Sequence, residues 1–286
     1  MASEVLREAN GLRFRCLEAG PAGSTPVLLL HGFPEGAESW SAQLEALAGA
    51  GLHAVAPDLR GYGGSDAPAT EEAYRLALLV ADITGLIDAL GAERIHLAGH
   101  DWGALVGWAF AAQHADRLLS WSALSVGHPA AFARAAAKDE DQRNRSAYIR
   151  LFRERGKAEQ VLAEDGYQRL RAMYRIGPDP DAIPEPVIER FVANLARPGR
   201  LTAALNYYRA ALADLAGLGP VSVPSQLVWG DQDPAVGATG TQLTASYMTG
   251  PYQLEVLPGA GHWLQFERPD QVSRLLVRHC QANPPE

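Results

Sequence analysis

The sequence has 286 residues, enough for one large domain or a core with an insertion, and 47% of them are hydrophobic, which is ordinary for a globular protein. The formal net charge of −8 argues against a nucleic-acid or anionic-membrane partner, because binding phosphates takes clustered Lys and Arg. Cys16 and Cys280 have no metal-type spacing, the N-terminus has no signal-peptide pattern, and no apolar stretch approaches the ~20 residues that span a bilayer. We therefore expect a cytoplasmic protein without a metal site.

Short apolar runs rich in β-branched residues alternate with helical patterns up to about residue 127 and predict strands. The predicted strands of this half are Val5–Ala9, Arg13–Glu18, Pro26–Leu30, His53–Ala56, Ile95–Ala98 and Trp121–Val126. Apolar residues from Leu79 to Leu90 recur at helical spacing, and Gly91 ends that helix. This order of strands and helices predicts a mostly parallel sheet with helices on both faces.

The pattern changes from His128 to about Gly219, where Ala, Arg, Glu and Tyr dominate and no strand is indicated. The sheet pattern then resumes with two strands and a last helix, at Ser225–Trp229, Gln253–Leu257 and Asp270–Gln281. We expect an eight-stranded core formed by residues 1–127 and 219–286, interrupted by a helical cap of residues 128–218.

The turn after the strand Ile95–Ala98 has the sequence Gly99-His100-Asp101-Trp102-Gly103 and leads into a helical run. Glycines on both sides allow a strained turn that exposes the central side chain above the sheet edge, where a serine is the usual residue. A carboxylate there is suited to displacing a leaving group from saturated carbon, as in epoxides or alkyl halides. Asp101 is therefore the candidate nucleophile, and an aspartate that only caps the following helix is the alternative.

Three further segments follow predicted strands, at the edge where open parallel sheets bind ligands. In His31–Glu35, the Phe33 N–H can form an oxyanion hole with the N–H of Trp102, and the bond before Pro34 can be cis. An ordinary turn with His31 packed in the core is the alternative for this segment.

The other two segments supply an acid and a base. Asp233 is the candidate that orients a histidine, and Asp231 on the same turn is its competitor. His262 lies on a glycine-rich loop and is placed to act as a general base. The chain order Asp101, Asp233, His262 is that of nucleophile, acid and base in an α/β-hydrolase fold. His100 is expected to pack beneath the turn.

With these motifs the chain resembles, over nearly its whole length, the soluble epoxide hydrolases of the α/β-hydrolase superfamily. The motifs are HGFPE, GHDWG, GDQD and GAGHW, at His31–Glu35, Gly99–Gly103, Gly230–Asp233 and Gly259–Trp263. The resemblance implies two cap tyrosines that hold and protonate the epoxide oxygen. Tyr208, in an aromatic pair before Arg209, and Tyr148, four residues before Phe152, match them. Simple packing is the alternative for both tyrosines.

The resemblance implies a cofactor-free enzyme that opens an apolar epoxide to a vicinal diol through a covalent ester on Asp101, which water activated by His262 then hydrolyses. A haloalkane or haloacid dehalogenase with the same nucleophile is an alternative. It is disfavoured because Phe33 and Trp102 stand where those enzymes usually carry Asn or Arg. A non-catalytic ligand-binding protein on this fold is a third interpretation. The protein could also pair as a homodimer.

Overall fold

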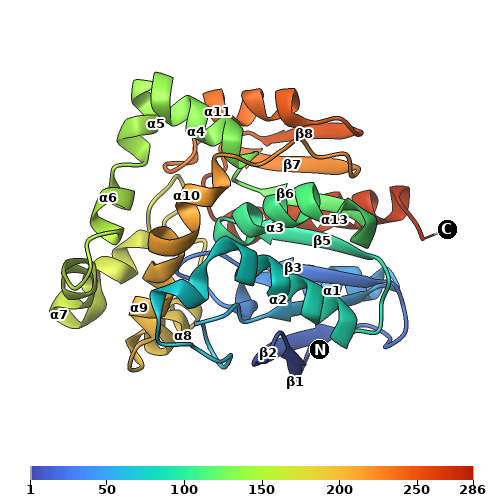
Figure 1. The fold of residues 1–286 in the computed structure, drawn as a ribbon, viewed down its shortest axis with the longest axis horizontal. Helices are drawn as coiled ribbons and strands as arrows, with labels where there is room; N and C mark the ends of the chain where they lie inside the picture. The colour runs from blue at the N-terminus through green and yellow to red at the C-terminus, as the bar shows by residue number, and fades with distance from the viewer. Residues whose placement is uncertain (1, 286) are drawn as a thin grey trace.

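The computed structural model describes residues 2–285 and contains an eight-stranded sheet in the order β1-β2-β4-β3-β5-β6-β7-β8 (Figure 1). Its strands are β1 (Ser3–Ala9), β2 (Leu12–Ala19), β3 (Pro26–Leu30), β4 (His53–Pro57), β5 (Ile95–His100), β6 (Leu118–Leu124), β7 (Ser225–Gly230) and β8 (Tyr252–Leu257). β2 pairs antiparallel with β1 and β4, and every later pair is parallel. The predicted fold class, a mostly parallel α/β sheet of eight strands, is confirmed.

One strand differs clearly from its prediction. We expected it at Trp121–Val126, but β6 spans Leu118–Leu124 and already pairs with β5 at Leu118. Its C-terminal end is set by Ser125, whose φ of 65° turns the backbone out of the extended conformation. The apolar pattern alone did not show this backbone change.

Helices cover both faces of the sheet, because the parallel strands are apolar on both sides. α2 (Leu76–Ala89) and α3 (Trp102–Gln113) pack on the face that carries Leu28 and Leu97. α1 (Ser41–Gly49), α12 (Leu264–Glu267) and α13 (Pro269–Ala282) pack on the opposite face. The predicted helix with an apolar stripe from Leu79 to Leu90 corresponds to α2. Short 3₁₀ turns lie at Ala37–Trp40, Glu71–Tyr74, Ala115–Arg117 and Thr244–Tyr247.

A long helical segment connects β6 to β7, and its helices lie together on one side of the sheet (left in Figure 1). Its elements are α4 (Pro129–Lys138), α5 (Glu140–Arg145), α6 (Tyr148–Phe152), α7 (Lys157–Met173), α8 (Glu185–Ala196), α9 (Arg200–Asn206), the π-helical turn Tyr207–Ala211 and α10 (Leu212–Leu215). α11 (Ala238–Leu243) follows β7 and packs on α4. The segment is held to the sheet loops by side-chain hydrogen bonds, such as Tyr174 Oη to Pro34 O at 2.6 Å. Within residues 2–285, every helix is too short or too polar to cross a lipid bilayer.

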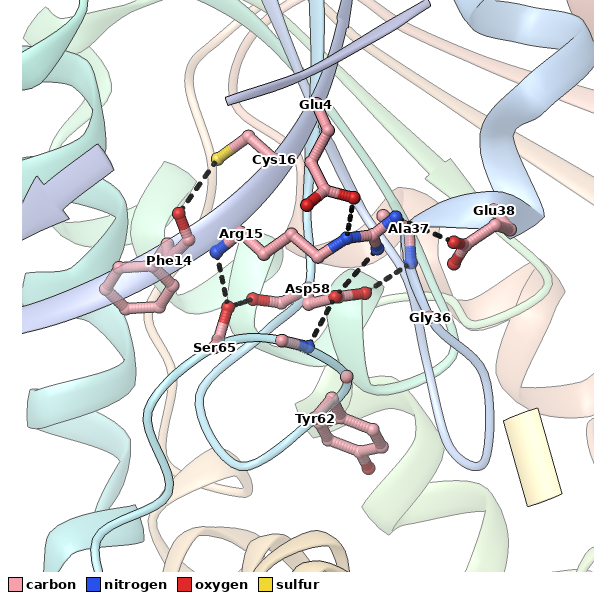
Figure 2. Close-up of polar contacts among 12 residues, drawn as sticks. Glu4, Phe14, Arg15, Cys16, Gly36, Ala37, Glu38, Asp58, Tyr62 and Ser65 are labelled. Carbon is pink, nitrogen blue, oxygen red and sulfur yellow. Dashed lines mark hydrogen bonds and ion pairs between the residues drawn. The ribbon is translucent and has the colours of Figure 1, made fainter. Parts of the chain in front are cut away.

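Asp58 joins the loops that follow β3 and β4 (Figure 2). Its fully buried carboxylate accepts hydrogen bonds from the backbone N–H groups of Ala37 and Gly64, each at 2.9 Å. Arg15 on β2 donates to the same carboxylate at 2.9 Å and also to Glu38 at 2.9 Å. A single buried charge therefore fixes two loops at the sheet edge where Phe33 lies.

We expect Asp58→Asn to lower the free energy of unfolding by about 3 kcal/mol, because an amide offers fewer acceptor sites and leaves part of this buried network unpaired. Urea denaturation measures the change. The matched control is Glu4→Gln, which breaks the exposed contact to Arg15 at 2.7 Å and should cost less than about 1 kcal/mol. Equal effects of the two substitutions would contradict the importance of the buried charge.

Candidate active site

Asp101 lies in the tight turn between β5 and α3, with φ 49° and ψ −115°. The turn is possible because Gly99 and Gly103, two residues before and after Asp101, have no side chain. A Cβ on Gly99 would lie 2.4 Å from Gly103 O, and a Cβ on Gly103 would lie 2.1 Å from Leu30 O. The backbone thus passes so close to itself that the Asp101 carboxylate is held at the end of the strand, 8% exposed.

The loop after β3 touches this carboxylate directly. The Phe33 N–H donates to Asp101 Oδ1 at 2.8 Å, and a Cβ on Gly32 would lie 2.4 Å from the Asp101 Cβ. The N–H of Trp102 is the first of helix α3, where backbone donors have no acceptor within the helix. The structure therefore brings both predicted oxyanion-hole residues to Asp101. The Phe33–Pro34 bond is cis.

His262 lies between two carboxylates. Its Nδ1 donates to Asp233 Oδ2 at 2.9 Å, and its Nε2 lies 3.7 Å from Asp101 Oδ2. The other Asp233 oxygen accepts from the N–H groups of Ala235 and Val236, which fixes the orientation of that carboxylate. Asp231 instead accepts from the Gly259 N–H at 2.8 Å. The carboxylate that pairs with His262 is therefore that of Asp233, and Asp231 stabilises the turn.

The charges of this triad support one another. Burial alone would lower the pKa of His262, but the two carboxylates of Asp233 and Asp101 raise it well above its ordinary value. Burial likewise opposes the charge of Asp101, yet His262 and the Phe33 N–H hold the pKa of that carboxyl below its usual range. The two carboxylates therefore favour the protonated form of His262.

Tyr148 and Tyr208 reach the same site from the helical segment. Their ring centroids lie 6.3 Å apart, and the Tyr208 ring packs edge-on against Trp102 at 4.9 Å. Burial and the negative charge of Asp101 raise the pKa of both phenols above the ordinary value. Both are therefore protonated donors close to the carboxylate. Tyr208 belongs to a π-helical turn, a feature that is frequent at functional sites.

His100 and Glu35 form a buried pair beneath the turn, and the sequence did not assign them a joint role. His100 Nδ1 lies 2.9 Å from Glu35 Oε2, and its Nε2 lies 2.9 Å from the carbonyl oxygen of His262. Both partners offer oxygens that can accept a hydrogen bond from the ring. Burial would raise the pKa of Glu35, but the interaction with His100 lowers it. The expectation that His100 packs beneath the turn was right in position but missed this pairing.

Asp101, Tyr148, Tyr208 and His262 lie where two arms of one cavity meet. The larger arm has a volume of about 650 Å³, and the smaller one about 280 Å³. Both arms are lined mainly by apolar side chains, such as Val126 and Phe132 in the larger arm and Met173 in the smaller. An apolar cavity with a few convergent polar groups is typical of a small-molecule site.

The family model of the α/β hydrolase fold matches residues 25–269. Epoxide hydrolase A of Mycobacterium tuberculosis is 40% identical over 96% of this chain and 96% of its own length. Epoxide hydrolase 3 of Xenopus tropicalis is 35% identical over 93% of this chain and 74% of its own length. The crystal structure of epoxide hydrolase A from Mycobacterium thermoresistibile covers 100% of both chains, with a TM-score of 0.85 and 35% sequence identity. The chain is therefore a hydrolase of the α/β-hydrolase fold family, and it belongs with the members of that family that are named epoxide hydrolases.

Proposed function

We propose that this protein opens an apolar epoxide to a vicinal diol through a covalent ester on Asp101. The observation that carries the proposal is the position of this carboxylate, which faces one imidazole and two protonated phenols in a single apolar cavity. A carboxylate displaces a leaving group from saturated carbon, and the phenols supply the proton that the departing oxygen needs. The names of the relatives point to the same reaction.

In the first step, an Asp101 oxygen attacks one epoxide carbon, and the bond from that carbon to the ring oxygen breaks. The ring oxygen takes a proton from the pair Tyr148 and Tyr208, so no free alkoxide forms. The products are a hydroxyalkyl ester on Asp101 and one phenolate. Both tyrosines act while their high pKa keeps them protonated at neutral pH.

Formation of the ester changes the charge around His262. The negative charge of Asp101 disappears, so one of the two carboxylates that raise the pKa of His262 is lost. The imidazolium can then return its proton to the phenolate and become the neutral base that the second step needs. The first reaction therefore prepares the base for the second.

In the second step, His262 takes a proton from a water molecule that attacks the carbonyl carbon of the ester. The N–H groups of Phe33 and Trp102 hold the resulting oxyanion. Collapse releases the diol, whose leaving oxygen takes the remaining proton of the attacking water. Asp101 is left as a carboxylate with one oxygen from water, and His262 is again an imidazolium paired with Asp233.

We also propose that residues 128–218 form a cap on a core of residues 1–127 and 219–286. The two junctions of this segment touch, since His128 at the start of α4 lies with its Nε2 3.1 Å from the carbonyl oxygen of Gly219. Burial lowers the pKa of His128 to about 4, so this contact is made by a neutral imidazole at pH 7. The cap would supply Tyr148 and Tyr208 to the site. The core would supply Asp101, Asp233 and His262.

We expect His262→Gln to accumulate the ester, because the first step needs Asp101 and the tyrosines but not a base. Mass spectrometry of this variant after exposure to styrene oxide should show a peptide containing Asp101 heavier by one epoxide. Asp101→Ala, treated alike, is the control and should show no adduct. An unmodified Asp101 peptide in a variant that still binds the epoxide would contradict covalent catalysis, and halide release from alkyl bromides without diol formation would favour a dehalogenase.

We expect Tyr148→Phe and Tyr208→Phe each to lower kcat/KM for epoxide opening about 100-fold, because each removes a proton donor from the leaving oxygen. Steady-state diol formation measures the loss. Tyr207→Phe is the matched control, since its hydroxyl donates to Arg60 O at 2.9 Å and points away from the cavity. It should cost about 1 kcal/mol of stability and leave kcat/KM nearly unchanged. Equal losses in all three variants would show a structural role only.

We expect Asp101→Ala to lower the pKa of His262, because the ring loses one of the two carboxylates that favour its protonated form. Titration of the His262 ring resonances by NMR checks this change. Asp231→Asn, on the same turn as Asp233 but without contact to the ring, should leave that pKa in place. A pKa that does not fall in Asp101→Ala would rule out the proposed coupling between ester formation and base activation.

A further inference from the structure

Helix α5, in the segment between β6 and β7, binds the backbone of the turn that follows β7 and carries Asp233 (Figure 1). Arg145 donates to the carbonyl oxygen of Asp233. Gln142 Nε2 donates to Ala235 O at 2.9 Å. Gln142 Oε1 accepts from the Gly237 N–H at 2.8 Å. Two side chains of the proposed cap therefore hold the turn on which a triad residue lies.

One of these contacts reaches the carboxylate of Asp233 through a single peptide unit. The Ala235–Val236 peptide is planar, so its C=O and its N–H point in opposite directions and move together. Its oxygen accepts from Gln142, and its N–H donates to Asp233 Oδ1 at 3.0 Å. The other Asp233 oxygen pairs with His262 Nδ1 at 2.9 Å. The side chain of Gln142 thus helps to set the direction of the carboxylate that meets the ring.

The next peptide, between Val236 and Gly237, is also held at both edges. Its carbonyl oxygen accepts from Trp229 Nε1 at 3.0 Å, and its N–H donates to Gln142. Two consecutive peptides of the turn are therefore fixed by side chains outside it, and both are bound by the same amide.

The burial of Gln142 is unusual for its type and place. Among the six described residues of α5 it alone is buried, and glutamine is mostly an exposed residue. Its Nε2 also donates to Ser146 Oγ at 2.9 Å, so both polar ends of the amide are used. An amide donates at one end and accepts at the other, which matches a C=O beside an N–H. An apolar side chain would fill the same space but leave both backbone groups unpaired.

We propose that Gln142 is a positioning residue that keeps Asp233 aligned with His262 and thereby sets the rate of ester hydrolysis. The kinetic part of this inference rests on the function proposed above, whereas the alignment of Asp233 does not. Formation of the ester needs Asp101 and the two tyrosines, but its hydrolysis needs His262 as a base that Asp233 orients. Loss of the Gln142 amide therefore slows the second step far more than the first.

The first test reads the His262 ring and does not depend on turnover. Burial lowers the pKa of His262 and Asp233 raises it, so Gln142→Met should lower this pKa because it loosens that pair. The other titratable groups against the ring, Asp101 and His100, are unchanged in the variant. Titration of the ring resonances by NMR measures the change, and circular dichroism confirms that the variant is folded.

The matched control is Thr239→Val. The Thr239 hydroxyl donates to Asp139 at the start of α5, so it joins the same two parts of the chain without touching the peptides around Ala235. If Gln142→Met does not fold, Gln142→Asn replaces it, because this amide is one methylene too short to reach both backbone groups. An unchanged pKa of His262 in the folded variant, or an equal fall in the control, would overturn the proposal.

The second test separates the two chemical steps. Single turnovers with styrene oxide, read by mass spectrometry of the Asp101 peptide, give the rates of ester formation and ester decay. We expect Gln142→Met to slow decay about tenfold or more and to change formation less than about twofold, because a misplaced base acts in the second step. In the steady state, kcat and KM should fall together as the ester accumulates. Equal slowing of both steps would contradict a positioning role.

The outcomes distinguish this inference from the proposed function. Ester that forms on Asp101 and decays at the wild-type rate in Gln142→Met would overturn the role of Gln142 and leave the proposed function standing. Absence of any ester, with the pKa of His262 lowered in Gln142→Met but not in Thr239→Val, would overturn the proposed function and leave the alignment of Asp233 by Gln142.

Discussion

The backbone turn at Asp101 is the constraint on which the rest of the site depends. The φ of 49° at Asp101 bends the backbone sharply. Because Gly99 and Gly103 have no Cβ, β5, α3 and the end of β3 approach to distances that a side chain at either glycine would prevent. The Asp101 side chain makes no capping hydrogen bond to helix α3. It meets the Phe33 N–H on one side and the His262 ring on the other. The proposed nucleophile, oxyanion donors and base come together because three strand-end loops share one edge of the sheet.

Charge is distributed in this site so that the proposed reaction would change it in two steps. Asp101 and Asp233 hold a proton on His262, while His100 and Glu35 form a separate pair beneath them. Formation of an ester on Asp101 would remove the negative charge of that carboxylate and so favour loss of the proton from His262. The neutral imidazole would then be available as a base for hydrolysis of the ester.

The sequence predicted most of the fold because its signals are local. Short apolar runs that alternate with helical patterns predicted the eight strands, and the glycines around Asp101 indicated the turn. The end of β6 was missed because it depends on the backbone of Ser125 rather than on hydrophobicity. The pairing of Glu35 with His100 could not be predicted, since two buried polar residues 65 positions apart carry no local sign of contact. Tyr148 and Tyr208 were found by resemblance alone, because a packing residue such as Tyr207 has the same helical pattern.

The covalent route is tested most directly by a single turnover in heavy-oxygen water with enzyme in excess over epoxide. Covalent catalysis predicts that the heavy oxygen enters the Asp101 carboxylate, and that the first diol carries the original, light Asp101 oxygen. Mass spectrometry of the peptide and of the diol reads both sites. Heavy oxygen in the diol with an unlabelled Asp101 would show direct attack of water on the epoxide and would contradict covalent catalysis.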